Sequence, residues 1–182
     1  HLFIGRLTLG HFTVIAFIAP YMVSNVGVTE AELAYIYLTG GFFTLFSSPI
    51  VGRLADRHGH LKFFTVVAML SLVPIWAITN LPQMNIYLAL VITSIMFILV
   101  AGRIIPAMTM ITASVNPEKR GGFMSVNAAI QQLGAGISSF VAGIIVVQSS
   151  SGQLEHYNLV GYLAIVATII AIVVARRLKA VS

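Results

Sequence analysis

The sequence of 182 residues has no cysteine and few charged residues. Without cysteine, the chain has no disulfide framework, no thiol nucleophile and no thiolate metal site. Charged residues make up 8% of the chain, whereas soluble domains contain about 25%. Hydrophobic residues reach 58%, and the mean hydropathy is +0.98. These few polar side chains would leave a water-soluble globule with a large apolar surface, so we expect lipid to surround most of the chain.

Signature motifs of soluble enzymes are also missing. The sequence contains no phosphate-binding glycine loop, no Gly-x-Ser-x-Gly elbow and no His-Glu-x-x-His pair. His58 and His60 alone make a weak metal site. We therefore expect no enzyme activity, no cofactor and no metal. The formal net charge of +5 would suggest a nucleic-acid partner in a soluble protein, but the basic residues lie between apolar stretches, so we expect no nucleic acid.

Long apolar stretches separated by polar breaks predict an all-α membrane protein. A helix needs roughly 20 apolar residues to cross the hydrocarbon region, and its backbone polar groups must be paired within the membrane. Between the first two stretches, Thr29 and Glu32 have the spacing of a helix-capping box. The polar segment 148–158 is expected to be a loop. The six predicted spans are residues 2–26, 31–51, 61–78, 85–115, 123–147 and 159–175.

The positions of lysine and arginine predict how the spans are oriented. Eight of the ten lie in or beside the breaks after the second and fourth spans and in the tail after the sixth, and the breaks after the first, third and fifth spans have none. Short loops rich in lysine and arginine stay on the cytoplasmic side. We therefore expect both chain ends in the cytoplasm of a cell, with the spans in the cell (inner) membrane. The basic residues of these three segments are Arg53, Arg57, Lys62, Lys119, Arg120, Arg176, Arg177 and Lys179.

Six spans of this kind divide into three plus three. The two units, at about 1–80 and 84–178, start on opposite sides of the membrane, as in an inverted repeat. We expect one six-helix bundle over residues 1–182. Because the chain begins at His1 and enters an apolar stretch at once, we also expect it to be part of a longer protein.

Polar side chains are concentrated in the first, second, fourth and fifth spans. Exposing them to lipid is costly, so these faces should turn inward. In the fifth span, Asn127 and Gln131 are four residues apart and share a helical face, where their amides are candidates to bind substrate or water. The alternative is that both residues only hydrogen-bond to neighbouring helices.

Three more residues are candidates for the substrate cavity. Arg103 lies in the inner part of the fourth span and would attract a substrate anion or make a gating contact, unless it snorkels to the headgroups. His11 is the one group inside the predicted spans that titrates near neutral pH, and it would couple transport to protons unless it is a neutral packing residue. Tyr37 lines the cavity or belongs to the aromatic belt.

The segment after the second span, residues 52–62, reads Gly-Arg-Leu-Ala-Asp-Arg-His-Gly-His-Leu-Lys. It resembles the signature loop of the major facilitator superfamily, Gly-x-Leu-Ala-Asp-Arg-x-Gly-Arg-Lys/Arg. The resemblance implies that Gly52 allows close helix packing, that Gly59 makes a tight turn, and that Asp56 and Arg57 form a cytoplasmic latch that gates alternating access. Histidine and leucine replace the last two basic residues of the pattern, at positions 60 and 61, which puts part of the charge network in doubt.

A second likeness covers residues 103–143, which are similar to the tenth and eleventh helices of bacterial drug and sugar efflux members of the same superfamily. The fifth span lacks the Gly-Pro pair of the antiporter signature, which favours the C-terminal half. The resemblance implies a secondary active transporter, or half of one, that moves a small molecule by alternating access, by proton-coupled efflux. The second six-helix half would come from the same polypeptide or from a second copy in a homodimer. A membrane scaffold without transport activity is the alternative.

Overall fold

The computed structural model describes residues 14–113 and 115–179, and it is helical apart from one short hairpin. Five helices in this part of the chain are long and apolar enough to cross a membrane. They are preceded by a shorter apolar helix, Val14–Val26, which ends in a π-helical turn, η1 (Met22–Val26). The membrane-length helices are α2 (Glu30–His58), α3 (His60–Thr79), α4 (Ile86–Ala113), α5 (Arg120–Ile145) and α6 (Tyr157–Lys179).

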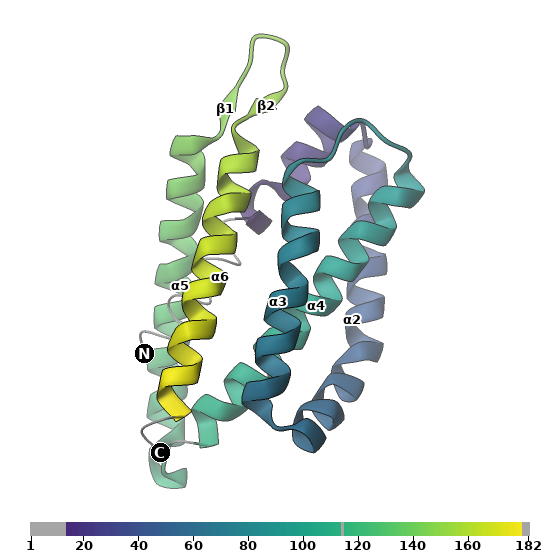
Figure 1. The fold of residues 1–182 in the computed structure, drawn as a ribbon. Coiled ribbons are helices and arrows are strands. Elements are labelled where there is room, and N and C mark those ends of the chain that lie inside the picture. The colour runs from purple at the N-terminus through teal and green to yellow at the C-terminus, as the bar shows by residue number, and fades with distance from the viewer. Residues whose placement is uncertain (1–13, 114, 180–182) are drawn as a thin grey trace.

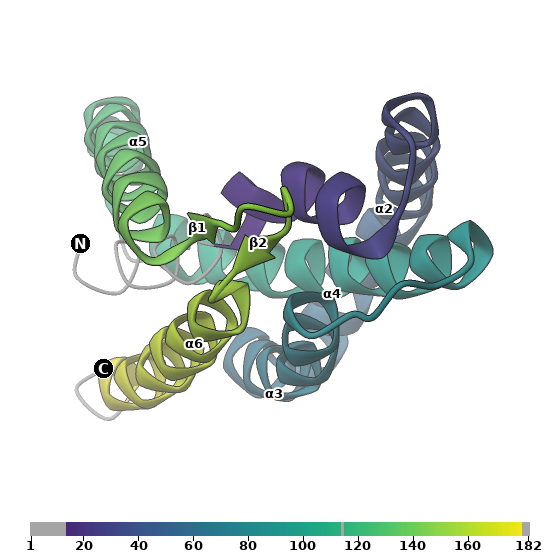
Figure 2. The ribbon, with the colours of Figure 1, turned by 90° about the horizontal axis from the view of Figure 1, so that it is seen from above.

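The helices surround α4, which crosses the middle of the bundle (Figure 2). α4 packs against α2 and α3, and α3 packs against α6. In the same view α3 and α6 lie on one side of α4, while α2 and α5 lie at opposite ends of the other side (Figure 2). α5 contacts α6 over a much smaller area than α3 does.

The basic segments lie at one end of the bundle, as the sequence predicts. The α2–α3 junction, the α4–α5 connection and the last turns of α6 all lie at the lower end in Figure 1. We call this the basic end, and the opposite end the hairpin end. The α4–α5 connection contains a short 3-10 turn, η2 (Pro117–Lys119).

The capping box predicted before α2 is confirmed. The backbone N–H of Glu32 donates to Thr29 Oγ1 at 3.3 Å, and the backbone N–H of Thr29 donates to Glu32 Oε2 at 2.9 Å. Together the two bonds pair backbone donors that have no partner within the first turn of the helix. The start of α2 is therefore fixed at Glu30.

The segment predicted as a polar loop contains a β-hairpin. Strand β1 (Val147–Gln148) pairs antiparallel with β2 (Leu154–Glu155). Asn25 holds the hairpin to the first helix: its Nδ2 donates to the carbonyl of Leu154 at 2.9 Å, and its Oδ1 accepts from the N–H of Leu154 at 2.8 Å. The side-chain amide thus supplies β2 with hydrogen bonds like those of a neighbouring strand. The sequence of the segment itself contains no sign of this distant partner.

Two tyrosines join the first helix to other parts of the hairpin end. The hydroxyl of Tyr157, on α6, donates to the carbonyl of Val14 at 2.8 Å. The hydroxyl of Tyr21 donates to the carbonyl of Leu81, in the α3–α4 connection, at 3.0 Å. The two rings stack with centroids 4.4 Å apart. The first helix is therefore tied both to α6 and to the α3–α4 connection.

At Gly161, α6 packs directly against α3. A Cβ at this position would overlap the side chain of Thr79, with its Cβ at 2.8 Å. Thr79 is buried and cannot move aside, because its own Cβ is part of the crowded contact. Glycine at 161 is therefore required by packing rather than by backbone conformation.

We predict that Gly161→Ala destabilises the protein. Overpacking of this kind costs about 1–3 kcal/mol, which a lower midpoint of thermal unfolding in detergent would show. The double variant Gly161→Ala, Thr79→Gly removes the side chain that the new methyl group would overlap, and it should recover part of the loss, since glycine in a helix has a cost of its own. An unchanged midpoint in the single variant would mean that α3 and α6 are not in contact at this point.

Candidate functional site

Arg103 lies inside the bundle, on the face of α4 that meets α3 and α6. Its side chain is 1% exposed. Nη1 donates to Thr168 Oγ1 on α6 at 3.0 Å and reaches Ser71 Oγ on α3 at 3.5 Å. The guanidinium is thus enclosed by three helices and does not snorkel to the headgroups, which the sequence had left open.

Asn127 faces α4 from the adjacent helix α5. It is 1% exposed, and its Nδ2 donates to Met108 Sδ at 3.7 Å, a weak acceptor. Its Oδ1 is buried and receives no hydrogen bond from the described residues. Gln131 lies one turn further along the same face and is half-buried. A buried carboxamide oxygen without a donor is unusual in a native structure, and functional sites are where such groups occur.

Tyr37 lies on α2 and is partly open. It is 44% exposed, and its ring centroid lies 6.2 Å from that of Phe97 on α4. It borders an apolar hollow of about 670 Å³ along α2, together with Leu38, Thr39, Gly41, Phe42, Phe43 and Leu45. The structure therefore gives Arg103, Asn127 and Tyr37 three different neighbourhoods. His11, the remaining candidate, lies outside the described residues.

The predicted gating loop is helical for most of its length. α2 continues through Asp56 and Arg57 to His58, and only Gly59 separates it from α3. Gly52 is accommodated within α2, and the helix ends only before Gly59, whose φ of 86° is one that glycine adopts easily. The tight turn at Gly59 is confirmed. The expected close packing at Gly52 is not seen, because a Cβ there would meet no atom within 4 Å.

The charges of this segment face outward. Asp56 and Arg57 are exposed, and His60 Nε2 lies 3.5 Å from Asp56 Oδ1, one turn away across Gly59. This contact is an ion pair only while the ring is protonated. Residues 14–113 and 115–179 contain no other ion pair. Histidine thus takes a place near the aspartate where the superfamily pattern has arginine.

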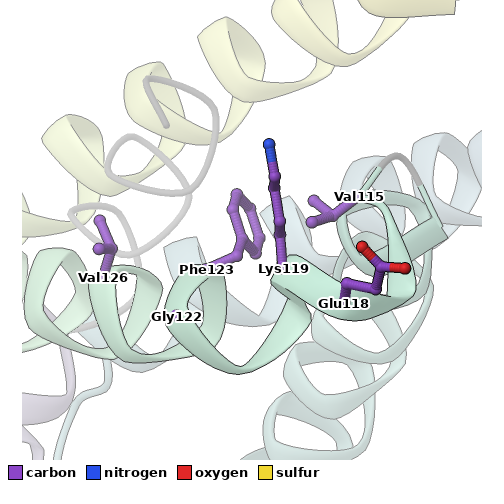
Figure 3. A pocket seen from close by; sticks show the side chains of 6 residues that line it. All are labelled: Val115, Glu118, Lys119, Gly122, Phe123 and Val126. Atoms are coloured by element: carbon purple, nitrogen blue, oxygen red, sulfur yellow. The ribbon is translucent and has the colours of Figure 1, made fainter.

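A second hollow lies at the basic end, where sequence reasoning expected only a break between spans. It measures about 530 Å³ and is lined by Val115, Glu118, Lys119, Gly122, Phe123 and Val126. Lys119, the last residue of η2, and Phe123, in the first turn of α5, project side by side, while Glu118 points away from them (Figure 3). In this segment, charged and apolar residues recur at helical spacing, as at Val115, Glu118 and Gly122. This spacing is the signal in the sequence that could have indicated the hollow.

Five membrane-length helices around enclosed polar side chains define a polytopic α-helical membrane protein. The chain belongs to the major facilitator superfamily: the family model described as Major Facilitator Superfamily matches residues 3–181. Membership implies a transport function, and members are generally not enzymes.

The chain is also similar to an uncharacterised MFS-type transporter, YbcL, of Bacillus subtilis (strain 168). The two are 24% identical over 162 residues, which make up 89% of this chain and 40% of the relative. The chain therefore spans about 40% of the length of this curated relative.

A substitution of Asn127 can distinguish a substrate-binding role of its amide from a packing role. Replacing a buried amide whose oxygen has no donor by an apolar side chain of similar size removes a desolvation cost of about 1–3 kcal/mol. We predict that Asn127→Leu leaves the full-length transporter as stable as before or more stable in detergent, while transport falls at least tenfold. Gln132→Leu, on the exposed side of the same helix, is the matched control and should transport normally. Reduced stability with normal transport in Asn127→Leu would assign the amide to packing.

Proposed function

We propose that this chain is one six-helix half of a secondary active transporter that moves a small molecule across the membrane by alternating access. The observation that carries the proposal is the superfamily match over residues 3–181 in a chain that spans only 40% of its relative. The apolar helix Val14–Val26 would be the outer part of the first span. In Figure 2, α2 and α5 lie at corresponding positions on either side of the centre of the bundle, and so do α3 and α6. This arrangement supports a 3+3 inverted repeat.

The second half would cover α2 and α5. In the most apolar 18-residue stretch of each of these helices, only 17% is buried, against 39–44% in α3, α4 and α6. Both lie on the side of α4 away from α3 and α6 (Figure 2). A transporter half needs one such open side for its partner, whereas lipid alone would not distinguish the two helices. The partner is the rest of the same polypeptide or, as the second candidate, another copy of this chain.

The substrate cavity would lie between the two halves, on this open side. We assign Asn127 and Gln131 to it as amide ligands, with Tyr37 and His11 as further lining residues. The contacts of Arg103 are with α3 and α6, on the other side of α4. The proposed pathway is therefore lined by uncharged polar groups in this half, apart from His11.

Proton-coupled efflux is the transport mode that the resemblance to drug and sugar efflux members favours. His11 is the one titratable group near neutral pH inside the spans of this chain. Coupling would use His11 or a carboxylate of the other half. The basic end would face the cytoplasm of a cell with the protein in its inner membrane. A scaffold without transport activity is the competing function.

The gating segment would act at this cytoplasmic end. Asp56 and Arg57 are exposed and free to contact a second half, and Gly59 holds the end of α2 against the start of α3. Such contacts would favour one state of the alternating-access equilibrium without touching the substrate. His60 would weaken the latch relative to the arginine of the superfamily pattern, because an imidazole lacks the permanent charge and the forked donors of a guanidinium.

We predict that Arg57→Ala lowers transport by the full-length protein while its amount in the membrane stays the same. The assay is proton-driven uptake into everted membrane vesicles, with ethidium and a pentose as probes. Arg53→Ala removes an equally exposed arginine one turn earlier and serves as the control. Normal uptake in Arg57→Ala would refute the latch, and no gradient-driven movement of solutes by the wild type in proteoliposomes would favour the scaffold.

A further inference from the structure

The positive charge of Arg103 has no counter-charge among the residues that the structure describes. Its described polar contacts are the two neutral hydroxyls of Ser71 and Thr168. Nε and Nη2 are both buried and have no hydrogen-bond partner among the described residues. A cation enclosed in a low-dielectric interior is strongly unfavourable unless an anion or several acceptors compensate it.

No carboxylate of this chain lies at the level of Arg103. The sequence contains five acidic residues, and every one of them is at a helix end or in a connection. Arg103, Ser71 and Thr168 instead lie near the middle of α4, α3 and α6. The acidic residues are Glu30 and Glu32 at the start of α2, Asp56 near its end, Glu118 in η2 and Glu155 in β2.

The unpaired atoms form the edge of the guanidinium that binds anions best. Nε–H and one N–H of Nη2 are parallel, so together they grip a carboxylate or a single anion from the side. The opposite corner, Nη1, is the one held by Thr168. The hydroxyls donate their own protons to backbone carbonyls, Ser71 to Ala68 at 2.7 Å and Thr168 to Ala164 at 2.8 Å. The oxygens of Ser71 and Thr168 therefore accept from Nη1, and neither of them occupies the Nε–Nη2 edge.

Helix packing is tight around this junction. Ala68 on α3, Ala107 on α4 and Ala171 on α6 are fully buried, in one apolar cluster with Phe64. They join the same three helices that enclose Arg103, so a large substrate could not reach the guanidinium without separating them. A ligand of this site would therefore be a single atom or a group of two or three heavy atoms.

We propose that the Nε–Nη2 edge of Arg103 binds a small monovalent anion, either a halide such as chloride or a small carboxylate. The anion neutralises the guanidinium and stabilises the junction of α3, α4 and α6. It is a resident ligand of the half rather than the transported solute, because the site faces away from the open side of α2 and α5. This inference goes beyond the proposed transport function, since it concerns equilibrium binding alone.

The test is thermal unfolding of the purified full-length protein in detergent, at constant ionic strength, in sodium chloride, sodium acetate or sodium gluconate. Gluconate is too large for the junction and serves as the reference anion. Chloride or acetate should raise the unfolding midpoint along a saturating curve. At an anion concentration 100 times the dissociation constant, the unfolding equilibrium should shift about 100-fold. Response to chloride alone would identify a halide site, and response to acetate would identify carboxylate binding.

Variants assign the effect to Arg103. Arg103→Gln should abolish the difference between the anions, whereas Arg176→Gln, which removes an exposed arginine near the end of α6, should retain it. Should Arg103→Gln fail to fold, Arg103→Lys keeps the charge without the two-donor edge and should raise the half-saturating concentration at least about tenfold. Equal midpoints of the wild type in all three salts would overturn the proposal. An unchanged chloride response in both Arg103→Lys and Arg103→Gln would also overturn the proposal.

Discussion

The structure depends on one constraint: a polar group in the hydrocarbon region must find its partner inside the protein. Most hydroxyls in the helices meet it by bonding to their own backbone. Thr39 donates to the carbonyl of Tyr35 at 2.7 Å, and Thr93 donates to that of Ala89 at 2.8 Å. Such bonds let threonine and serine occupy membrane helices at little cost. Against this background, the groups of Arg103 and Asn127 that remain unpaired are the exceptions that need an explanation.

The same constraint separates the two sides of the bundle. α3 and α6 pack closely and enclose Arg103 with α4, whereas α2 and α5 are largely uncovered by the described residues. In the proposed transporter, the packed side gives the half its rigidity and the open side provides the surface for the partner and the pathway. The hydrogen bonds of Asn25, Tyr21 and Tyr157 hold the hairpin end together, as rigid-body movement of a half requires.

The sequence was sufficient to predict five of the six expected spans as membrane-length helices, and to predict that the basic segments share one end. Hydropathy and charge report these directly, and the helices α2 to α6 follow them. It could not show which way Arg103 points, because apolar residues surround that part of α4 on all sides and leave no polar face to read. Close helix contact was predicted at Gly52 but occurs at Gly161, since the spacing between helices depends on tertiary packing. The hairpin after α5 was missed because Asn25, which binds it, is 129 residues away from Leu154.

The most direct test of the central claim uses the absence of cysteine from this chain. Single cysteines are introduced at Gln131 and at Leu133 of the full-length protein, with any cysteine elsewhere replaced, and treated in native membranes with a membrane-impermeant maleimide. A thiol reacts only where water permits the thiolate to form. If polar faces gather along an internal aqueous path, Gln131→Cys will be labelled and Leu133→Cys, on an exposed apolar face, will not. Labelling at 133 with none at 131 would contradict the account.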